Sequence, residues 1–371
     1  MPVSYHYNKF PPPNLDWPSI VPLIGPATLA LGDFKGMLDA IPNASVLLAP
    51  LRDQEAVLSS KIEGTQATLG EVLEYEADAS SDSPRSAEKV DDIQEVLNYR
   101  RALSFASKRL DELPLCGRLL KESHAILMES VRGKDKAAGK YKTVQNGIGK
   151  PGCTLDTAKF LPIAPEHLED GMAAWERFTH EPFTDTLVQL AIIHAEFEAL
   201  HPFLDGNGRL GRMIIPLFLY EQKMLSYPAF FISEYFELNR EEYYERLLAV
   251  SRDDDWTGWC VFFLKGMATQ ARENTRKARA IMQLYEDRKA WIIGKTHSQY
   301  AVPALDFIFR QPIFRSDHFW KHSDIPEQTA RHILRTIRDE LLLEIRPSSG
   351  RRPAAYSYEE LLRIAEGRPP L

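Results

Sequence analysis

The twelve residues His201–Arg212 read HPFLDGNGRLGR and combine, in one short stretch, the residue types that handle a phosphate group. Within it, Gly206, Asn207 and Gly208 permit a tight turn that points backbone N–H groups at an anion. The residues that follow have the apolar spacing of a helix, so these N–H groups would stand at a helix N-terminus, where phosphates bind well. The stretch therefore predicts a turn, the start of a helix and an anion site in one place.

The charged side chains of this stretch extend the prediction. Arg209 and Arg212 lie one helical turn apart, so both guanidinium groups face the same side and can each hold phosphate oxygens through two donors. Asp205 offers a hard oxygen ligand for Mg²⁺, and His201 is the group suited to removing a proton near neutral pH. A chance Gly- and Arg-rich loop is the alternative, which the combination of types disfavours. The chain contains no GxxxxGK(S/T) motif, so any bound ATP would use this loop.

The string also resembles, position for position, the signature HPFx(D/E)GNGRxxR of the Fic family. The resemblance implies a Fic-fold helical bundle that transfers AMP from ATP, with Mg²⁺, to a Ser, Thr or Tyr hydroxyl of a protein. It implies that His201 deprotonates the hydroxyl, that Asp205 holds the metal and that Arg212 holds the γ-phosphate. The residues it assigns to binding ATP and its phosphates are Gly206, Asn207, Gly208, Arg209, Leu210, Gly211 and Arg212. No signature position is missing, so we expect an active enzyme.

A second motif lies far upstream, where residues 59–64 read SSKIEG. It is similar to the family's inhibitory pattern (S/T)xxxE(G/N), with Ser59, Glu63 and Gly64 at the three defined positions. The resemblance pairs Glu63 with Arg212. A carboxylate held in the guanidinium fork excludes a γ-phosphate that needs the same donors. A helix with an ordinary glutamate is the alternative; we expect a self-inhibited enzyme.

The stretch Ala138–Pro162 holds several glycines among alternating residues, a pattern typical of a β-hairpin. It resembles the family's flap, which lays a segment of an unidentified target protein beside the active site by strand addition. The family carries an arginine and an aromatic residue in this stretch, whereas Lys142 and Asn146 stand here. The difference bears on the choice of target and leaves the chemistry unchanged.

The stretch Phe236–Val250 resembles the family's segment near the adenine ring. From that resemblance we take Asn239 and Tyr243 as ATP contacts. Tyr244 and Trp259 fit the hydrophobic core equally well, and the core is the stronger interpretation for Trp259.

The composition bounds the class of protein. With 371 residues and 44% hydrophobic residues, the chain is long enough for two or three globular domains. Its net charge of −7 disfavours a protein that coats a polyanion as a whole.

The three cysteines are too few and too scattered for a disulfide framework or a zinc site. No apolar run spans a bilayer, so we expect a cytoplasmic protein without a membrane partner. His194 lacks a third metal ligand at suitable spacing and is interpreted as a core histidine.

Periodicity predicts a mainly α-helical chain in three parts: an N-terminal arm and helical region (1–86), a Fic catalytic core (87–296) and a C-terminal domain (297–371). We expect residues 1–26 to form an extended proline-rich arm and 78–86 a polar loop. The other predicted elements are helices over 27–75 with a break at Ile41–Pro42, over 87–132, over Thr186–Leu200 as a buried central helix, and over about 255–295.

From Val302 onward, three short helical stretches precede two β-like runs around a Ser-Gly turn, the layout of a winged helix-turn-helix. The stretch 326–335 would be the helix that enters a DNA groove in DNA-binding examples. The arginines of this part are Arg331, Arg335, Arg338, Arg346, Arg351 and Arg352. The acids opposing them are Asp339, Glu340 and Glu344, so the patch is only mildly basic and a protein-binding role stays open.

Three alternatives to AMP transfer remain at this point. The chain would be a winged-helix DNA-binding regulator whose Fic core senses nucleotide, or an enzyme that removes AMP with Glu63 positioning a water. An inert scaffold is disfavoured by the complete signature. We also expect self-modification on an exposed hydroxyl and assembly as a homodimer.

Overall fold

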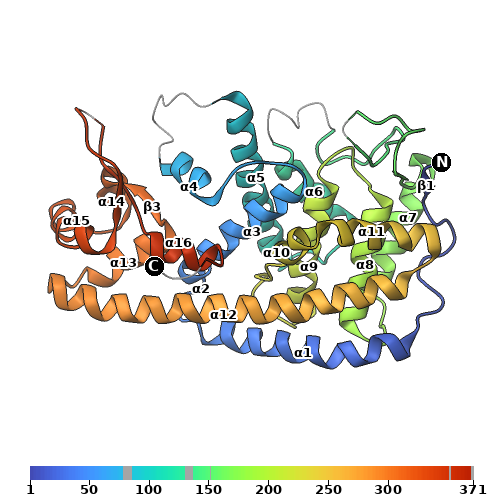
Figure 1. The fold of residues 1–371 in the computed structure, drawn as a ribbon, viewed down its shortest axis with the longest axis horizontal. Helices are drawn as coiled ribbons and strands as arrows, with labels where there is room; N and C mark the ends of the chain where they lie inside the picture. The colour runs from blue at the N-terminus through green and yellow to red at the C-terminus, as the bar shows by residue number, and fades with distance from the viewer. Residues whose placement is uncertain (78–85, 130–136, 151, 351, 369–371) are drawn as a thin grey trace. The chain divides into compact units, whose positions relative to one another are not determined.

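The computed structural model describes residues 1–77, 86–129, 137–150, 152–350 and 352–368 (Figure 1). The structure is 66% helical with few strands, which confirms the mainly α prediction. Its helices are α1 (Trp17–Ala40), α2 (Ala44–Leu47), α3 (Ala49–Ile62), α4 (Leu69–Ala77), α5 (Ala87–Arg109), α6 (Gly117–Leu127), α7 (Pro165–His180), α8 (Thr186–Leu200), α9 (Asn207–Glu221), α10 (Ser233–Leu238), α11 (Arg240–Asp253), α12 (Trp256–Thr296), α13 (Ala301–Arg310), α14 (Ser316–His322), α15 (Glu327–Leu341) and α16 (Glu359–Ala365). Its strands are β1 (Val3–Ser4), β2 (Phe160–Leu161), β3 (Ile313–Arg315), β4 (Leu343–Arg346) and β5 (Ala355–Ser357).

The chain packs into two compact units. The first contains residues 1–35, 58–65 and 94–272, and the second contains 36–57, 66–93 and 273–371. The division into three parts expected from the sequence, 1–86, 87–296 and 297–371, stays a prediction.

The first unit is built around α8, whose bounds agree with the predicted central helix. Its sequence is apolar on all sides, and all but two of its residues are buried because other elements surround it. Asp185 caps its first turn by accepting two backbone N–H groups. Trp175 and Trp259 donate their indole N–H groups to carbonyl oxygens of α8 at 2.9 and 2.7 Å. Trp259 is therefore a core residue, as interpreted from the sequence.

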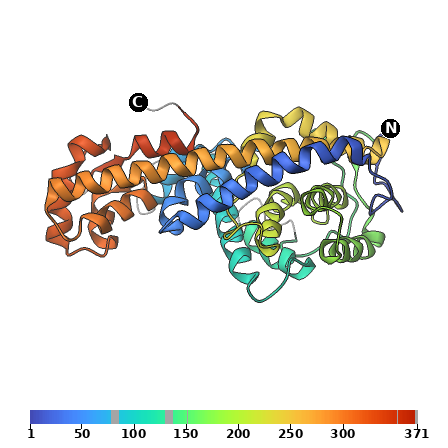
Figure 2. The same cartoon turned by 90° about the horizontal axis from the view of Figure 1, so that it is seen from below.

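The helices α7, α9 and α11 pack against α8. Figure 1 shows α8 between these neighbours, and Figure 2 shows α7, α8 and α9 nearly along their axes. Because α9 follows α8 after six residues and packs back on it, the loop 201–206 is held at one end of a rigid helical pair. The fold thus places the signature stretch at a buried helix end.

The N-terminal segment differs from the extended arm expected over residues 1–26. Residues 3–4 form β1, which pairs in parallel with β2, and α1 already begins at Trp17. Pro22 and Pro26 lie inside this helix, where each removes one backbone donor. Both prolines are exposed, whereas Ile20 and other apolar residues of α1 are buried. Burial of that apolar face outweighs the local preference of proline, which misled the sequence interpretation.

The arm itself is anchored in the core of the first unit. Tyr5 donates its hydroxyl to the buried Glu196 carboxylate at 2.5 Å, and the Nε2 atom of His6 lies 2.7 Å from the other carboxylate oxygen. The Nδ1 atom of His6 lies 2.7 Å from the Ser251 hydroxyl. These contacts attach the N-terminal residues to α8 and α11.

The hairpin predicted within 138–162 does not form as a pair of strands in the described residues. One antiparallel bridge joins Ile148 to Phe160, and Ile148 donates its N–H to the Phe160 carbonyl at 2.9 Å. The strand that contains Phe160 pairs instead with β1 from the N-terminus. The glycines favour turns over paired strands here, so the flap is a loop closed at its base.

The second unit contains a three-stranded antiparallel sheet in the order β3–β5–β4. Along the chain its elements follow as α13, β3, α14, α15, β4 and β5, and Figure 1 shows them gathered together. The helix α15 is strongly amphipathic and buries Ala330, Ile333, Leu334 and Ile337. The sequence predicted the helices and two of the strands but missed β3, which is only three residues long, and α16.

Two further expectations are tested in part. The predicted break near Ile41 is present, since α1 ends at Ala40 and α2 begins at Ala44. The predicted long helix over about 255–295 is confirmed as α12. Most of the predicted polar loop, residues 78–85, and residues 130–132 of the predicted helical region lie outside the described residues. Among the helices of the described part, none is long and apolar enough to cross a membrane.

Candidate functional site

The candidate site begins where α8 ends. His201 caps α8 in the left-handed conformation (φ 46°), and its N–H donates to the Phe197 carbonyl at 3.0 Å. This conformation is uncommon for a residue with a Cβ, and it turns the chain sharply out of the helix. The buried Nδ1 atom of His201 has no hydrogen-bond partner within the described residues. The turn of the backbone therefore sets the position of the imidazole.

The next turn starts α9 and exposes its first N–H groups. Gly206 is the N-cap of α9 with φ 76°, a conformation that favours glycine. Asn207 locks the loop, because its Oδ1 accepts the Phe203 N–H at 2.8 Å and its Nδ2 donates to the Phe203 carbonyl at 2.9 Å. Since Gly206 has no side chain to cap the helix, the first-turn N–H groups remain for another acceptor. A helix N-terminus of this kind suits phosphate oxygens.

Asp205 is oriented by a neighbouring helix. His124 of α6 stacks on Phe203 at a ring distance of 3.8 Å and accepts the Gly139 N–H on Nδ1. Its Nε2 must then carry the proton that it donates to the Asp205 carbonyl at 2.9 Å. Burial, with a smaller effect of the Arg209 charge, lowers the pKa of His124 to about 4, so this neutral arrangement persists at physiological pH. The Asp205 side chain itself is 45% exposed and accepts the Gly206 N–H.

Both signature arginines already hold carboxylates. Arg209 is buried and donates through Nη1 to Glu95 of α5 at 3.2 Å. Arg212 is only 1% exposed and makes three hydrogen bonds to α3 and the turn after it. They run to the Ser59 hydroxyl at 2.9 Å, the Ser59 carbonyl at 2.6 Å and the Glu63 carboxylate at 2.7 Å. The geometry thus brings together the upstream motif and the signature.

Glu63 also lies against the start of α9. A Cβ atom placed on Gly208 would stand 2.2 Å from the Glu63 Oε1 atom, so the carboxylate fits here only because residue 208 has no side chain. Desolvation would raise the pKa of Glu63, but the charge and hydrogen bond of Arg212, with Arg209 and His201, outweigh it and hold that pKa below its usual range. The Glu63 carboxylate is therefore ionised, and it lies at the start of α9, where a phosphate group would bind.

Two residues of α11 fix the end of α3 that carries Glu63. Arg240 and Tyr244 both donate to the Ile62 carbonyl, at 2.5 and 3.3 Å. Glu63 lies in the turn after Ile62, the last residue of α3, and Gly64 follows in the same turn with φ 108°. The predicted inhibitory residues Ser59, Glu63 and Gly64 therefore occupy one ordered turn beside Arg212.

The sequence interpretation did not identify Glu198, an acid next to this cluster whose side chain is 11% exposed. Its Oε1 atom has no hydrogen-bond partner among the described residues, and a Cβ on Gly211 would approach it to 2.3 Å. Desolvation raises the pKa of Glu198 to about 8, with Arg212 opposing and Glu63 adding to the shift. The signal was available in the sequence, because Glu198 is an acid one turn before His201 in the mostly apolar helix α8.

Lys142 from the flap is a second buried ionisable group. Its Nζ donates to the Asn146 side chain at 2.9 Å and to the Leu200 carbonyl at the end of α8 at 3.2 Å. Desolvation lowers the pKa of Lys142 to about 7. Desolvation followed by the Lys142 charge lowers the pKa of His201 to about 4, against the opposing carboxylates. His201 is therefore neutral near pH 7 in this structure.

Tyr243 and Asn239 make side-chain hydrogen bonds to α8 and α10, respectively. Tyr243 is 1% exposed and bonds His194 Nε2 at 3.0 Å through its hydroxyl, while His194 Nδ1 faces the Gly211 carbonyl at 3.0 Å. The latter bond places the His194 proton on Nδ1, so His194 is a satisfied core histidine as interpreted. Tyr244 is 41% exposed, and its hydroxyl donates to the carbonyl of Ile62, the residue before Glu63. The adenine contacts assigned to Asn239 and Tyr243 stay a prediction.

A helical pair whose connecting loop presents a neutral histidine, a carboxylate, a helix N-terminus and two arginines defines a Fic-type site. Two family models support this class: "Fic/DOC family N-terminal" matches residues 21–108, and "Fic/DOC family" matches residues 114–219. Together they cover more than half of the chain. The chain belongs to the Fic/DOC family.

Curated relatives share only part of their length with this chain. Protein adenylyltransferase fic-1 of Caenorhabditis briggsae is 27% identical over 43% of this chain and 30% of its own length. A probable protein adenylyltransferase of Aquifex aeolicus is 35% identical over 22% of this chain and 26% of its own length. The chain thus spans less than a third of these relatives.

Solved structures support the fold over a wider range. A Fic family protein from Desulfovibrio desulfuricans matches 94% of this chain and 98% of its own with a TM-score of 0.60 and 22% identity. A Fic domain containing signaling protein from Bacteroides thetaiotaomicron matches 70% of this chain and 97% of its own with a TM-score of 0.57 and 16% identity. At these identities the similarity shows the fold alone.

Proposed function

We propose that this protein transfers AMP from MgATP to a Ser, Thr or Tyr hydroxyl of a target protein or of itself, and that Glu63 holds it inactive. The observation that carries this proposal is the set of three hydrogen bonds that Arg212 makes to Ser59 and Glu63. These bonds join the guanidinium group of the signature residue Arg212 to the upstream motif of the same chain. The relatives named as protein adenylyltransferases support the reaction class.

The chemical step needs few groups. The hydroxyl oxygen attacks the α-phosphorus of ATP, the bond to pyrophosphate breaks, and the hydroxyl proton moves to His201. A neutral imidazole with a buried nitrogen that has no partner among the described residues suits this role. Most of the remaining catalysis is positioning and charge stabilisation, as in phosphoryl transfer generally.

The start of α9 would hold the phosphates. The N–H groups of Asn207 and Gly208 belong to its first turn, and Gly206 offers no competing cap. Arg209 stands one turn further, and Arg212 would take the γ-phosphate. Leu210 and Gly211 contribute backbone and close packing within the same helix.

Asp205 would hold Mg²⁺. Its carboxylate is 45% exposed. The Oδ1 atom accepts the Gly206 N–H and lies 3.8 Å from Arg209, whereas Oδ2 makes no hydrogen bond or ion pair with the described residues. A single carboxylate fits this ion, because Mg²⁺ is commonly bound by one or two carboxylates together with substrate phosphates and water. When bound, the ion would neutralise charge on the phosphate oxygens.

Inhibition follows from competition for the same donors. The Glu63 carboxylate occupies Arg212 and lies against Gly208, so a γ-phosphate cannot use either group until Glu63 moves. Because the pKa of Glu63 is lowered, the contact is fully formed above the ordinary carboxyl range and is lost only as the pH falls through that lowered pKa. We therefore expect inhibition to persist across physiological pH. Target presentation by the flap, homodimer assembly and a cytoplasmic location stay predictions.

The test of this function uses ATP labelled at two different phosphates. The Glu63→Gly protein is incubated with Mg²⁺ and either α- or γ-labelled ATP, with and without a cell lysate, and labelled proteins are identified by mass spectrometry. Transfer of AMP retains the α-label and loses the γ-label. Retention of the γ-label would identify a kinase instead, and no retention of either label would reject transfer.

The pKa of His201 predicts the pH dependence of the reaction. A base acts in its neutral form, so a pKa lowered to about 4 keeps His201 competent well below its ordinary range. For the Glu63→Gly protein we expect protonation of His201 to cause no loss of kcat/KM as the pH falls from about 7 to about 5.5, because this profile reports the free enzyme. Loss of half the rate near pH 6.5 would show that His201 titrates as an exposed histidine and would contradict the structure.

A further inference from the structure

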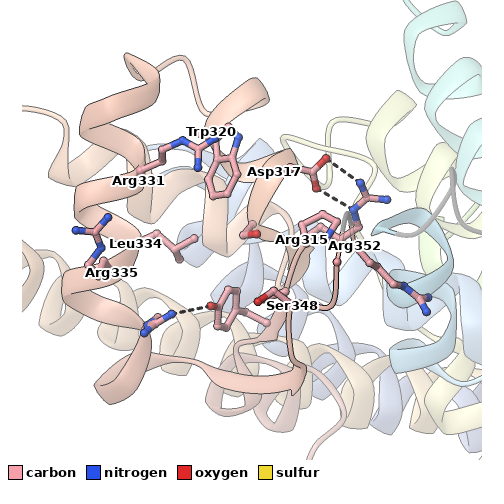
Figure 3. Close-up of a pocket in the computed structure, with 14 residues that line it drawn as sticks. Arg315, Asp317, Trp320, Arg331, Leu334, Arg335, Ser348 and Arg352 are labelled. Carbon is pink, nitrogen blue, oxygen red and sulfur yellow. Dashed lines mark hydrogen bonds and ion pairs between the residues drawn. The ribbon is translucent and has the colours of Figure 1, made fainter.

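The second unit contains a basic pocket that AMP transfer does not use. The pocket has a volume of about 530 Å³ and lies between α14, α15 and the β4–β5 hairpin (Figure 3). Five arginines line it, Arg315, Arg331, Arg335, Arg338 and Arg352, against one acid, Asp317. An excess of guanidinium groups in a hollow indicates an anionic ligand.

The one acid is already neutralised. Asp317 binds Arg315 through both carboxylate oxygens at 2.8 and 2.7 Å and also contacts Lys321 at 3.3 Å. These two cations lower the pKa of Asp317 against the opposing effect of burial, so it stays ionised and paired. The arginines of α15 therefore determine the charge that a ligand meets.

Two of these arginines contact both an aromatic residue and an acid, and Arg331 pairs with Glu327 at 2.7 Å. Figure 3 shows the Arg331 guanidinium over the face of Trp320, at 3.9 Å from the ring centre. Arg338 donates to the Tyr356 hydroxyl at 3.4 Å and contacts Asp339. Arg335, between them on α15, makes no hydrogen bond or ion pair with any residue that the structure describes, and it is exposed. Its five donors are thus available to a ligand.

The exposed face of α15 continues the pocket outward. Gln328, Arg331, His332 and Arg335 are all exposed and recur at helical spacing, whereas the opposite face is buried. Glu327 is an acid on this exposed face, and it is paired with Arg331. Arginine and glutamine side chains bind phosphates and the edges of bases. The pocket is therefore one end of a longer donor-rich surface, which a free nucleotide or a single phosphate would leave mostly uncovered.

We infer that the second unit binds duplex DNA, with α15 against a groove and the pocket around a backbone phosphate. The order of elements and the sheet order β3–β5–β4 agree with the winged helix-turn-helix expected from the sequence, in which the helix at this position enters the groove. An acidic protein segment fits less well, because the donors follow one helix face and a neighbouring hairpin, the elements that dock into grooves.

The test measures fluorescence anisotropy of a labelled pool of 24-base-pair duplexes of random sequence, titrated with the full-length protein at about 50 mM salt. We expect saturable binding that weakens steeply as salt rises, because counterions are released from the phosphates. Arg335→Ala should weaken binding by about fivefold or more and lower the salt dependence. The matched control Arg310→Ala removes an exposed arginine of α13 outside the pocket and should change affinity by less than about twofold.

Three results would overturn the inference. They are no binding at low salt, equal losses in the two variants, and competition by polyglutamate as effective as that by unlabelled duplex, which would indicate an acidic protein partner. Thermal unfolding of both variants checks that they are folded. AMP transfer measured in the Glu63→Gly background should be unchanged by Arg335→Ala, so failure of this inference and failure of the proposed function are distinguishable.

Discussion

Replacing Glu63 with glycine is expected to raise the incorporation of AMP by about tenfold or more. The replacement removes the carboxylate that holds Arg212 at 2.7 Å and lies against Gly208, so both groups become available to the γ-phosphate. A charge-assisted hydrogen bond contributes about 1.5–3 kcal/mol, and 1.4 kcal/mol corresponds to about a tenfold change in an equilibrium. The measurement is the initial rate of α-label transfer in wild type and variant at equal protein concentration.

The chain offers a matched control for this effect. Glu237 of α10 pairs with Lys61 at 3.3 Å, so Glu237→Gln removes a different ion pair on the same inhibitory helix without touching Arg212. This control should leave transfer at the wild-type rate. Self-inhibition through Arg212 would be rejected by equal rates in wild type and Glu63→Gly, or by an equal increase in Glu237→Gln.

Removing the His201 imidazole in the Glu63→Gly background is expected to reduce transfer by about a hundredfold or more, the contribution typical of a general base. His201→Ala should leave ATP affinity nearly unchanged, because the phosphate donors belong to α9. The rate is followed by α-label transfer and the affinity by calorimetric titration with MgATP. A large loss of affinity would instead mean that the residue shapes the binding loop.

An exposed histidine of the same unit provides the control for this second variant. His167 of α7 is exposed and contacts Tyr7, away from the signature loop. His167→Ala should retain transfer within about twofold of the Glu63→Gly parent, since no group of the site depends on it. Persistent transfer in His201→Ala would exclude His201 as the base.

The sequence predicted well where local patterns are strong. The central helix α8 has the predicted bounds because its mostly apolar residues require burial on every side. The sequence predicted less well where a tertiary contact outweighs the local preference of a residue. Trp17 starts a helix among prolines, because the apolar face of α1 is buried. Phe160 makes one bridge to Ile148 in the flap, but the strand that contains it pairs with the N-terminal strand β1.

The residues of the signature indicated phosphate chemistry without any structure, because side-chain type and fixed spacing are properties of the sequence alone. The state of each group depends on the fold. Burial makes His201 neutral and Glu198 a weak acid, since the cost of desolvating a charge depends on what surrounds it. Glu63 meets Arg212 only after the chain of 148 intervening residues has folded. The ion pair of Arg209 with Glu95 corresponds to no sequence motif. Contacts between distant parts of the chain carry no periodic signal, so tertiary packing decided which donors of the site are occupied.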